Sequence, residues 1–286
     1  MSIVVTGATG ALGRLVIDVL LTTVPADQLV AVVRNKEKAA DLAARGVELR
    51  IADYSEPATL AGVFRGGDRV LLISGSEVGH RIPQHKAVIE AAKAAGVAQL
   101  AYTGVLGGPE ADFQLAAEHK VTEQAILDSG LPHTFLRNGW YTENYTAHLA
   151  PVLEHGAVVA SAGEGRVASA ARADYATAAA AVLTGDGHLG KAYELSGDIA
   201  WSFAEYAAEL SRQTGRTIAY SDVPAGTHLE ILTGAGLPRP LAEIFVDVDA
   251  AVGRGLLAGT TGDLARLTGR PTTPLADSVA AALATA

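Results

Sequence analysis

Three glycines near the N-terminus have the spacing of a loop that could hold phosphate groups. Gly7, Gly10 and Gly13 follow the pattern Gly-x-x-Gly-x-x-Gly, between a β-branched run at residues 3–5 and an apolar helical stripe that starts at Leu12. A loop without side chains lets a diphosphate approach the next helix, whose unpaired N–H groups and dipole attract negative charge. In this setting the pattern predicts a dinucleotide site. The alternative is a tight strand-to-helix turn that binds no ligand.

A basic residue after the second expected strand bears on which dinucleotide is bound. A site for NAD usually has a carboxylate about twenty residues beyond the glycines, where it holds the ribose hydroxyls. In this chain Val33 is followed by Arg34 and Asn35, and a guanidinium can donate forked hydrogen bonds to the 2′-phosphate of NADPH. The sequence therefore favours NADPH. The alternative is a surface arginine whose stem packs on a helix.

Two further segments should lie at the same edge of the sheet as the glycines. Asp53 ends the third expected strand and could accept a hydrogen bond from the adenine amino group, or could instead cap the turn at residues 55–57. Residues 74–78 (Ser-Gly-Ser-Glu-Val) follow the fourth expected strand, where the cofactor of such a fold runs. Their small side chains would allow close passage of the ribose and diphosphate, although an ordinary loop would have the same composition.

The catalytic pair common in short-chain dehydrogenases is absent. Those enzymes use Tyr-x-x-x-Lys, in which the lysine lowers the pKa of the tyrosine so that the phenol can protonate an alkoxide. None of the 8 tyrosines in this chain has a lysine four residues later. A quinone needs no such donor, because hydride addition gives a phenolate-like oxygen with a pKa of roughly 10, which water can protonate. The absence therefore favours an electron-poor aromatic acceptor.

The same absence leaves a second class of function open. A sensor that binds NADP(H) without turning it over would also lack the catalytic pair. An epimerase or dehydratase that holds NAD is disfavoured, both by Arg34 and by the missing pair.

Aromatic and amide side chains gather after the sixth expected strand, in residues 137–145 (Arg-Asn-Gly-Trp-Tyr-Thr-Glu-Asn-Tyr). Only 5% of the chain is aromatic, so this density predicts a stacking surface beside the nicotinamide. The alternative is a set of core aromatics where two lobes meet. His119 and Glu123, one turn apart on an expected helix, are interpreted as a pair on a helix surface and not as a proton relay.

Strands and helices alternate through the first half of the chain. Apolar runs predict strands at residues 3–5, 29–33, 48–52, 69–74, 99–103 and 133–137, and helical periodicity predicts helices at 12–20, 36–45, 57–65, 82–95 and 113–129. Several strands are almost continuously apolar, as in a parallel sheet covered on both faces. The order implies right-handed crossovers and an α/β fold with a doubly wound parallel sheet of the Rossmann type.

Helical segments dominate after about residue 145. They are expected at 174–183, 202–213, 238–254, 262–267 and 274–283, with short strands near 158, 192–195 and 217–220. Ser202 and Glu205 form a capping-box pattern. We expect an NADP-binding Rossmann domain at residues 1–150 and a smaller mixed C-terminal substrate lobe, or lid, at 151–286. The boundary is soft, and one strand of the lobe is free to return to the main sheet.

The composition limits the class of protein. Of 286 residues, 49% are hydrophobic and 19% charged, which is typical of a globular chain. A net charge of −9 argues against nucleic acid as a partner, and the lack of cysteine excludes disulfides and thiolate metal sites. No basic leader opens the chain and its apolar runs are short, so we expect no signal peptide, no membrane insertion and a cytoplasmic location. We expect no bound metal. The sequence leaves open whether the protein forms a homodimer.

Several segments resemble the NmrA-like atypical short-chain dehydrogenases, most of all the NADPH:quinone oxidoreductases of that family. These segments are residues 6–13, 33–35, 73–78, 136–141 and 171–175, with further similarity at 154–156 and 271–275. The resemblance thus runs from end to end, which makes it far more specific than the glycine loop alone. It implies flavin-free reduction of a quinone by direct hydride transfer from NADPH.

The resemblance also implies which residues form the site. The cofactor contacts would be Gly7, Ala8, Thr9, Gly10, Ala11, Leu12, Arg34, Ser76, Glu77, Val78, Asn138, Gly139, Trp140, Tyr141, Thr142, Glu143 and Arg172. Tyr141 and Asn144 would border the quinone, with Trp140 near the nicotinamide. Related dye reductases leave dyes and azo compounds open as acceptors, and a redox sensor of the NmrA type is the alternative function. Gly75 and the pair Thr103-Gly104 stand where we expect serines, which leaves the acceptor open.

Overall fold

Seven parallel strands form the main sheet of the computed structural model, in the order β3-β2-β1-β4-β5-β6-β9. Their bounds are β1 Ile3–Val5, β2 Leu29–Val33, β3 Glu48–Ile51, β4 Arg69–Leu72, β5 Gln99–Val105, β6 His133–Asn138 and β9 Lys191–Leu195. The structure describes residues 2–285, so positions 1 and 286 of the expected domains lie outside it. The winding direction switches between β1 and β4, and sheets of this kind bind ligands beyond the carboxyl ends of their strands at such a point.

Helices cover both faces of this sheet, because alternate residues of each strand point to opposite sides. In β1, Ile3 and Val5 belong to a core shared with α1 and α7, whereas Val4 belongs to a core shared with α3 and α4. The helices of this layer are α1 Ala11–Leu20, α2 Ala40–Ala44, α3 Arg81–Ala95, α4 Ala116–Ser129, α7 Arg172–Thr184 and α11 Asp263–Thr268. The predicted doubly wound α/β fold is confirmed.

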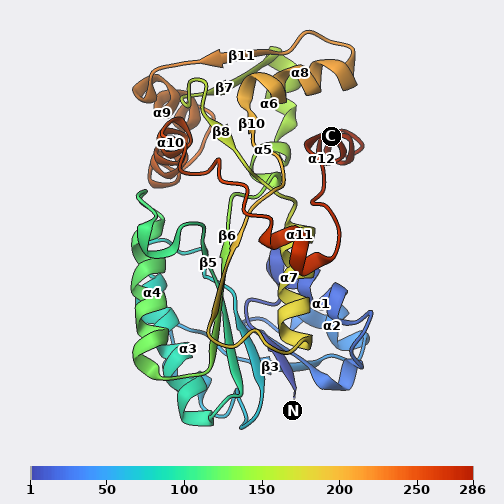
Figure 1. Cartoon of the computed structure of the whole chain (residues 1–286), viewed down its shortest axis with the longest axis vertical. Helices are drawn as coiled ribbons and strands as arrows, with labels where there is room; N and C mark the ends of the chain where they lie inside the picture. The colour runs from blue at the N-terminus through green and yellow to red at the C-terminus, as the bar shows by residue number, and fades with distance from the viewer. Residues whose placement is uncertain (1, 286) are drawn as a thin grey trace.

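A smaller lobe stands above the carboxyl edge of the sheet (Figure 1). Its strands are β7 Ala157–Ala160, which pairs with β11 Ala219–Asp222, and β8 Arg166–Val167, which pairs with β10 Trp201–Ser202. Its helices are α5 Glu143–Thr146, α6 Leu149–His155, α8 Phe203–Thr214, α9 Ala225–Gly234, α10 Arg239–Gly253 and α12 Leu275–Leu283. The lobe has its own aromatic core, and the predicted capping box of Ser202 and Glu205 is present at the start of α8.

The two lobes are interleaved along the sequence. Helix α7 packs on α1, and β9 pairs in parallel with β6, although both elements follow residue 150. Helix α11 packs on α7 and β9, near the end of the chain. In Figure 1 the chain accordingly passes between the lower sheet and the upper lobe more than once.

Some predicted elements differ from the observed ones. Residues 57–65 were expected to form an α-helix, but only a 3-10 turn forms at Pro57–Leu60, because Ala61 is already extended and Gly62 then has φ of +74°. Other 3-10 turns lie at Ala26–Gln28, Glu37–Ala39 and Gly108–Glu110. The second of these replaces the first turn of the helix expected at 36–45. Helices α5, α6 and α9 were not predicted.

Candidate cofactor and substrate site

The glycine loop joins β1 to α1 with its backbone packed too closely for side chains. Gly7 adopts φ of +60°, and its carbonyl accepts a hydrogen bond from the Gly10 amide at 2.9 Å. A Cβ atom on Gly13 would clash with the same carbonyl oxygen and would lie 2.8 Å from the Cα atom of Ala8. Gly10, at the N-cap of α1, has no side chain to satisfy the first amides of the helix. The residues present thus fit a bound diphosphate.

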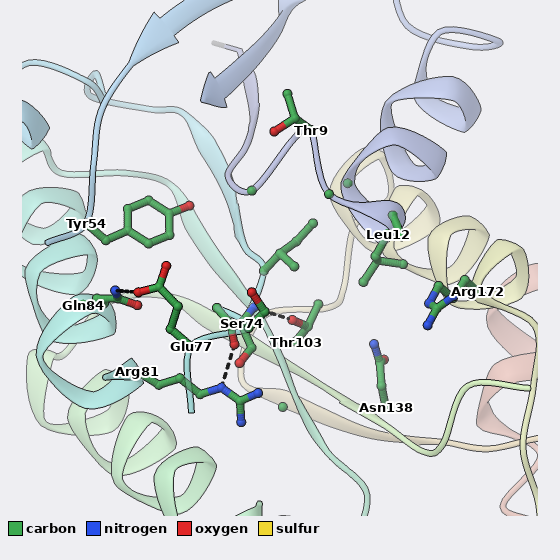
Figure 2. A pocket seen from close by; sticks show the side chains of 18 of the residues that line it. Thr9, Leu12, Tyr54, Ser74, Glu77, Arg81, Gln84, Thr103, Asn138 and Arg172 are labelled. Atoms are coloured by element: carbon green, nitrogen blue, oxygen red, sulfur yellow. Dashed lines mark hydrogen bonds between the residues drawn. The ribbon is translucent and has the colours of Figure 1, made fainter. Parts of the chain in front are cut away.

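One cavity of about 600 Å³ extends from this loop along the carboxyl edge of the sheet, which is within the usual size of a ligand site. Figure 2 shows Thr9 and Leu12 on one side of it, with Tyr54 and Glu77 at one end and Asn138 and Arg172 at the other. The predicted residues that line it are Gly7, Thr9, Gly10, Ala11, Leu12, Arg34, Asp53, Ser76, Glu77, Asn138, Gly139, Trp140, Tyr141, Asn144 and Arg172.

Four predicted contact residues do not line the cavity. Ala8 is fully buried beneath the loop, and Val78 lies on the surface with 37% exposure. Thr142 is buried and its hydroxyl lies 2.8 Å from that of Ser169. The Glu143 carboxylate accepts hydrogen bonds from the backbone amide of Arg172, at 2.9 and 3.1 Å. Of these four, Glu143 supports the cavity by holding the backbone of Arg172.

Charged groups surround the end of the cavity where the adenosine of a dinucleotide would lie. Arg34 and Glu77 form an ion pair at 3.0 Å, and Gln84 donates to the same carboxylate at 2.9 Å. Hydrogen bonds from Gln84 and Arg34 lower the pKa of Glu77. The Asp53 side chain accepts from the Ser55 amide at 2.9 Å, so it caps the following turn while also lining the cavity. Arg34 thus faces the predicted phosphate position with one carboxylate already beside it.

The aromatic segment after β6 lies at the opposite end of the cavity. Asn138 donates to the Tyr141 hydroxyl at 3.2 Å, and the Arg172 guanidinium lies over the Tyr141 ring, 4.9 Å from its centre. Arg172 also donates to the Asn144 side chain at 2.9 Å. Burial raises the pKa of the Tyr141 phenol, which keeps it protonated. One connected polar cluster therefore forms from four residues that the sequence predicted at the site: Asn138, Tyr141, Asn144 and Arg172.

The smaller lobe contributes to this end through Trp140. Its ring packs edge-on against Phe245 of α10, with ring centres 6.3 Å apart. Trp140 thus lines the cavity and also packs between the two lobes, as the alternative of core aromatics expected, whereas a stacking surface beside the nicotinamide stays a prediction.

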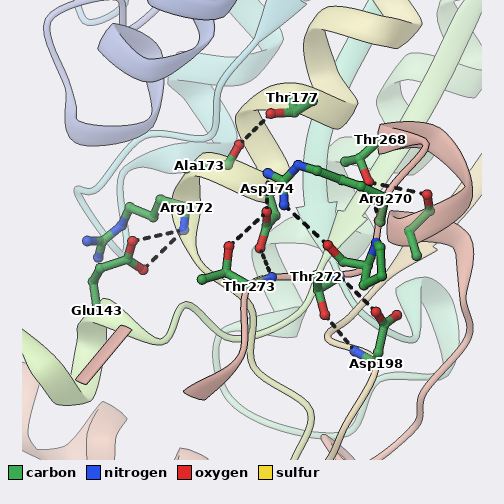
Figure 3. Close-up of polar contacts among 12 residues, drawn as sticks. Glu143, Arg172, Ala173, Asp174, Thr177, Asp198, Thr268, Arg270, Thr272 and Thr273 are labelled. Carbon is green, nitrogen blue, oxygen red and sulfur yellow. Dashed lines mark hydrogen bonds and ion pairs between the residues drawn. The ribbon is translucent and has the colours of Figure 1, made fainter. Parts of the chain in front are cut away.

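Arg172 is the first residue of α7, and a buried carboxylate two residues later anchors this end of the helix. Asp174 is fully buried and accepts hydrogen bonds from Arg270 at 2.7 Å and from the Thr273 amide at 2.8 Å (Figure 3). Thr272 and Asp198 are linked in the same network. This network links the segment before α12 to α7. Arg172, at the start of α7, lines the cavity.

His119 corrects the sequence interpretation. It was expected on a helix surface with Glu123, but it is 8% exposed, lines the cavity and contacts the Tyr102 hydroxyl at 2.7 Å through Nδ1. Glu123 instead pairs with Arg137 at 2.8 Å. Burial lowers the pKa of His119 to about 3, because α4 packs this residue against the sheet and α3. Because the buried face of α4 also contains polar residues, its sequence did not indicate which face is buried.

Arg81 and His85 at the start of α3 were also missed. The His85 ring lies between the Gly75 amide and the Thr122 hydroxyl, at 3.1 and 2.9 Å. Arg81 lines the cavity and donates to the Gly75 carbonyl at 2.6 Å. The only signal in the sequence was a basic residue just beyond the 74–78 segment.

Two absences concern residues 2–285 alone. In this part of the chain no three His, Cys, Asp or Glu side chains form a cluster that could hold a metal ion. Over the same residues, no helix combines the length and the apolar character needed to cross a bilayer.

Comparison with known proteins extends these findings. The model of the NmrA-like family matches residues 1–254. Quinone oxidoreductase 2 of Escherichia coli strain K12 is 49% identical over 277 residues, which are 97% of each chain. A crystal structure of NADPH-dependent quinone oxidoreductase from Escherichia coli, complexed with NADPH, superposes with a TM-score of 0.96 at 48% identity and covers 98% of this chain and 99% of the other.

Reductases of dyes are similar as well. The triphenylmethane reductase of Citrobacter sp., solved with NADP(H), has a TM-score of 0.94 at 43% identity and covers 98% of this chain and 100% of its own. An NAD(P)H azoreductase of Xenophilus azovorans is 32% identical over 96% of each chain.

Proposed function

The chain belongs to the NmrA-like family, and we propose that it is an NADPH-dependent quinone oxidoreductase. Its relative at 49% identity carries that activity in its name, and the two chains match over 97% of their lengths. The observation that carries the proposal is the single cavity that joins the glycine loop to the Asn138–Tyr141 cluster. This cavity allows a dinucleotide and an aromatic acceptor to bind at the same edge of the sheet.

The residues of this chain fit the cofactor at both ends. Backbone amides at the start of α1 bind the diphosphate, which small residues allow to approach. Arg34 recognises the 2′-phosphate, and Asn138 with Tyr141 borders the nicotinamide end. When bound, NADPH supplies the hydride. Of the predicted contacts outside the cavity, Glu143 acts by positioning Arg172.

The acceptor is a quinone or a similarly electron-poor aromatic compound. No Tyr-x-x-x-Lys pair is present to protonate an alkoxide, and a hydroquinone oxygen has no need of one because its pKa is roughly 10. Trp140 and Leu115 supply apolar walls beside the cluster of Asn138 and Tyr141. Hydride transfer is direct, with no flavin and no metal.

The test is NADPH oxidation by the purified protein with 1,4-benzoquinone, followed by the absorbance of the reduced nicotinamide. We expect oxidation well above the uncatalysed rate, with NADPH preferred over NADH. The supernatant of heat-denatured protein should carry no flavin fluorescence. Tight binding of NADPH without turnover on quinones, azo compounds or dyes would replace the proposal with the sensor alternative.

A further inference from the structure

Arg81 contributes a positive charge to the cavity, and none of the residue roles proposed above uses this charge. It is the first residue of α3, and its side chain is only 11% exposed. Within residues 2–285, the guanidinium makes one hydrogen bond, from Nε to the Gly75 carbonyl at 2.6 Å. Figure 2 shows the guanidinium extending below Ser74, on the opposite side of that residue from Thr9. Its remaining nitrogens are therefore directed away from the glycine loop.

One of those nitrogens is buried without a hydrogen-bond partner. Nη1 of Arg81 has no hydrogen-bond acceptor among residues 2–285, and it forms only a long ion pair with Glu118, at 4.0 Å. Glu118 already accepts a hydrogen bond from the Gly79 amide at 3.1 Å. A buried guanidinium nitrogen without an acceptor is costly, so its retention needs an explanation.

The other groups around Arg81 do not neutralise it. His85 and His119 are uncharged, because burial lowers their pKa to about 4 and about 3. Tyr102 and Tyr141 are phenols whose pKa is raised by burial. Besides Glu118, these four groups are the titratable neighbours that interact electrostatically with Arg81. The cavity therefore holds an incompletely compensated positive charge in a protein whose net charge is −9.

The cavity also has apolar lining and a second unused donor. Leu115 and Trp140 line it together with Arg81. The indole Nε1 of Trp140 is also buried without a hydrogen-bond partner among the described residues. A flat apolar wall with two donors fits an aromatic ring that carries an oxygen anion.

We propose that Arg81 binds the oxygen of the acceptor and selects acceptors that become anionic when they receive hydride. The proposal rests on the proposed quinone reductase function and adds a specificity-determining residue to it. A cation fixed in a partly desolvated site stabilises charge that develops during reaction more than it stabilises a neutral ground state.

The charge balance of the reaction distinguishes two acceptor classes. Hydride transfer breaks a C–H bond of the dihydronicotinamide and forms an O–H bond at one quinone oxygen. Both C=O π bonds are lost as the ring becomes aromatic, and the other oxygen carries the negative charge of the hydroquinone monoanion, with NADP⁺ as the other product. A proton from water then gives the neutral hydroquinone. A cationic triphenylmethane dye receives the same hydride at its central carbon and becomes neutral, so no oxygen anion forms. Arg81 should assist the first reaction and repel the second acceptor.

Arg81→Gln tests this selection through a ratio of two activities. We expect kcat/KM for 1,4-benzoquinone to fall about 10- to 100-fold, the value of one charge-assisted hydrogen bond. The kcat/KM for a cationic triphenylmethane dye should stay the same or rise. Equal losses on both acceptors, or no loss on the quinone, would overturn the proposal.

Two control variants separate charge from folding and cofactor binding. Lys86→Gln removes one positive charge from the exposed face of the same helix and should leave both activities unchanged. Arg81→Lys keeps the charge and should restore part of the quinone activity. The Kd of NADPH should change less than about threefold in all three variants, because a larger change would place Arg81 in cofactor binding.

A binding measurement tests the anion site without turnover. 4-Nitrophenol is titrated optically on the NADP⁺ complex, because its phenolate absorbs visible light. In wild type and Lys86→Gln we expect the bound compound to ionise at a pH about one unit lower than the free compound, and in Arg81→Gln close to the free value. Failure of wild type to bind the phenolate in preference to the phenol overturns the Arg81 proposal. Absence of quinone turnover with this preference intact overturns only the proposed function.

Discussion

Arg34 is already paired in this structure, and the pairing changes what its removal should do. Its guanidinium contacts Glu77 at 3.0 Å beside the predicted position of the 2′-phosphate. Arg34→Ala takes away the phosphate partner and leaves the Glu77 carboxylate facing the anion. We expect the Kd of NADPH to rise about 10- to 100-fold, and that of NADH to change little. Calorimetric titration with both cofactors measures this, with Lys36→Ala as the control. Equal weakening of NADPH and NADH would contradict the assignment.

Removal of the Glu77 charge should have the opposite effect on the affinity for NADPH. Glu77→Gln keeps a side chain of the same size while removing the charge that competes with the phosphate for Arg34. Because the pair is largely exposed, the gain is small, and we expect NADPH to bind up to about fivefold more tightly. The effect should shrink at high salt, which a titration series in sodium chloride would show. Weaker binding of NADPH by this variant would mean that the carboxylate itself contacts the cofactor.

Sequence reasoning found the residues whose role depends on local structure. The glycine loop and Arg34 are fixed by one strand-to-helix connection and by one strand end, so their spacing along the chain predicts where they lie. Arg81 and His119 reach the cavity only because α3 packs on β4, α4 packs on β5, and the two helices pack on each other. Packing between elements leaves little trace in the sequence, particularly on helices whose buried faces include polar residues such as His85 and Thr122.

At the scale of elements, the contact between α1 and the loop that precedes it depends on Gly13. A methyl group there would clash with the Gly7 carbonyl oxygen, so Gly13→Ala must move the helix away from the loop. We expect a loss of about 1–3 kcal/mol in the free energy of unfolding and weaker NADPH binding, because the first amides of α1 move with the helix. Urea denaturation and titration with NADPH measure the two effects.

A matched glycine in another helix provides the control. Gly226 lies in α9, and a methyl group added there would have no other atom within 4 Å. Gly226→Ala should stabilise the protein by roughly 0.5–1 kcal/mol and leave cofactor affinity unchanged, because alanine is the better helix former. If Gly13→Ala behaved like Gly226→Ala, the close approach of helix and loop would have no role in binding.

Elements with strong periodicity were predicted well, and those decided by a single residue were not. The six expected strands of the first half all form. Five of them are mostly buried between the two helical layers, whereas β3, at the edge of the sheet, is only partly buried and leaves Ile51 49% exposed. The helix expected at 57–65 stops after one 3-10 turn that ends at Leu60, where Ala61 becomes extended and Gly62 follows with φ of +74°, and periodicity alone treats both residues as neutral. Helix α9 was missed because its sequence has only one buried residue, His228.

At the scale of the whole molecule, contacts distant in sequence hold the lobes together. The Asp174 network joins α7, in the sheet layer, to the segment that leads into α12 of the smaller lobe. The sequence left open that one strand of the smaller lobe returns to the main sheet, and β9 does so. The division of the chain into two domains near residue 150 stays a prediction. Pairing of β9 with β6 depends on which sheet edge is free, and the sequence of β9 does not contain that information.

The burial of His85 and His119 should make the stability of the whole protein depend on pH. Burial, with a smaller contribution from Arg81, lowers the pKa of His85 to about 4, and burial lowers that of His119 to about 3. An unfolded histidine has a pKa of roughly 6.5. Between these values the unfolded chain binds more protons than the native protein, so stability falls as the pH falls. The histidine contribution is fully present above about pH 6.5 and is lost progressively below it.

Between pH 7 and pH 5, each histidine should therefore reduce the free energy of unfolding by about 2 kcal/mol. Because most carboxylates titrate at lower pH, this window isolates the histidines. Urea denaturation at several pH values should show the fall in wild type and about half of it in His119→Gln or His85→Gln. Substitution of the exposed His155 should leave the slope unchanged. A variant of either buried histidine that kept the full slope would mean that its imidazole is charged in the folded protein, where it would add a second cation beside Arg81.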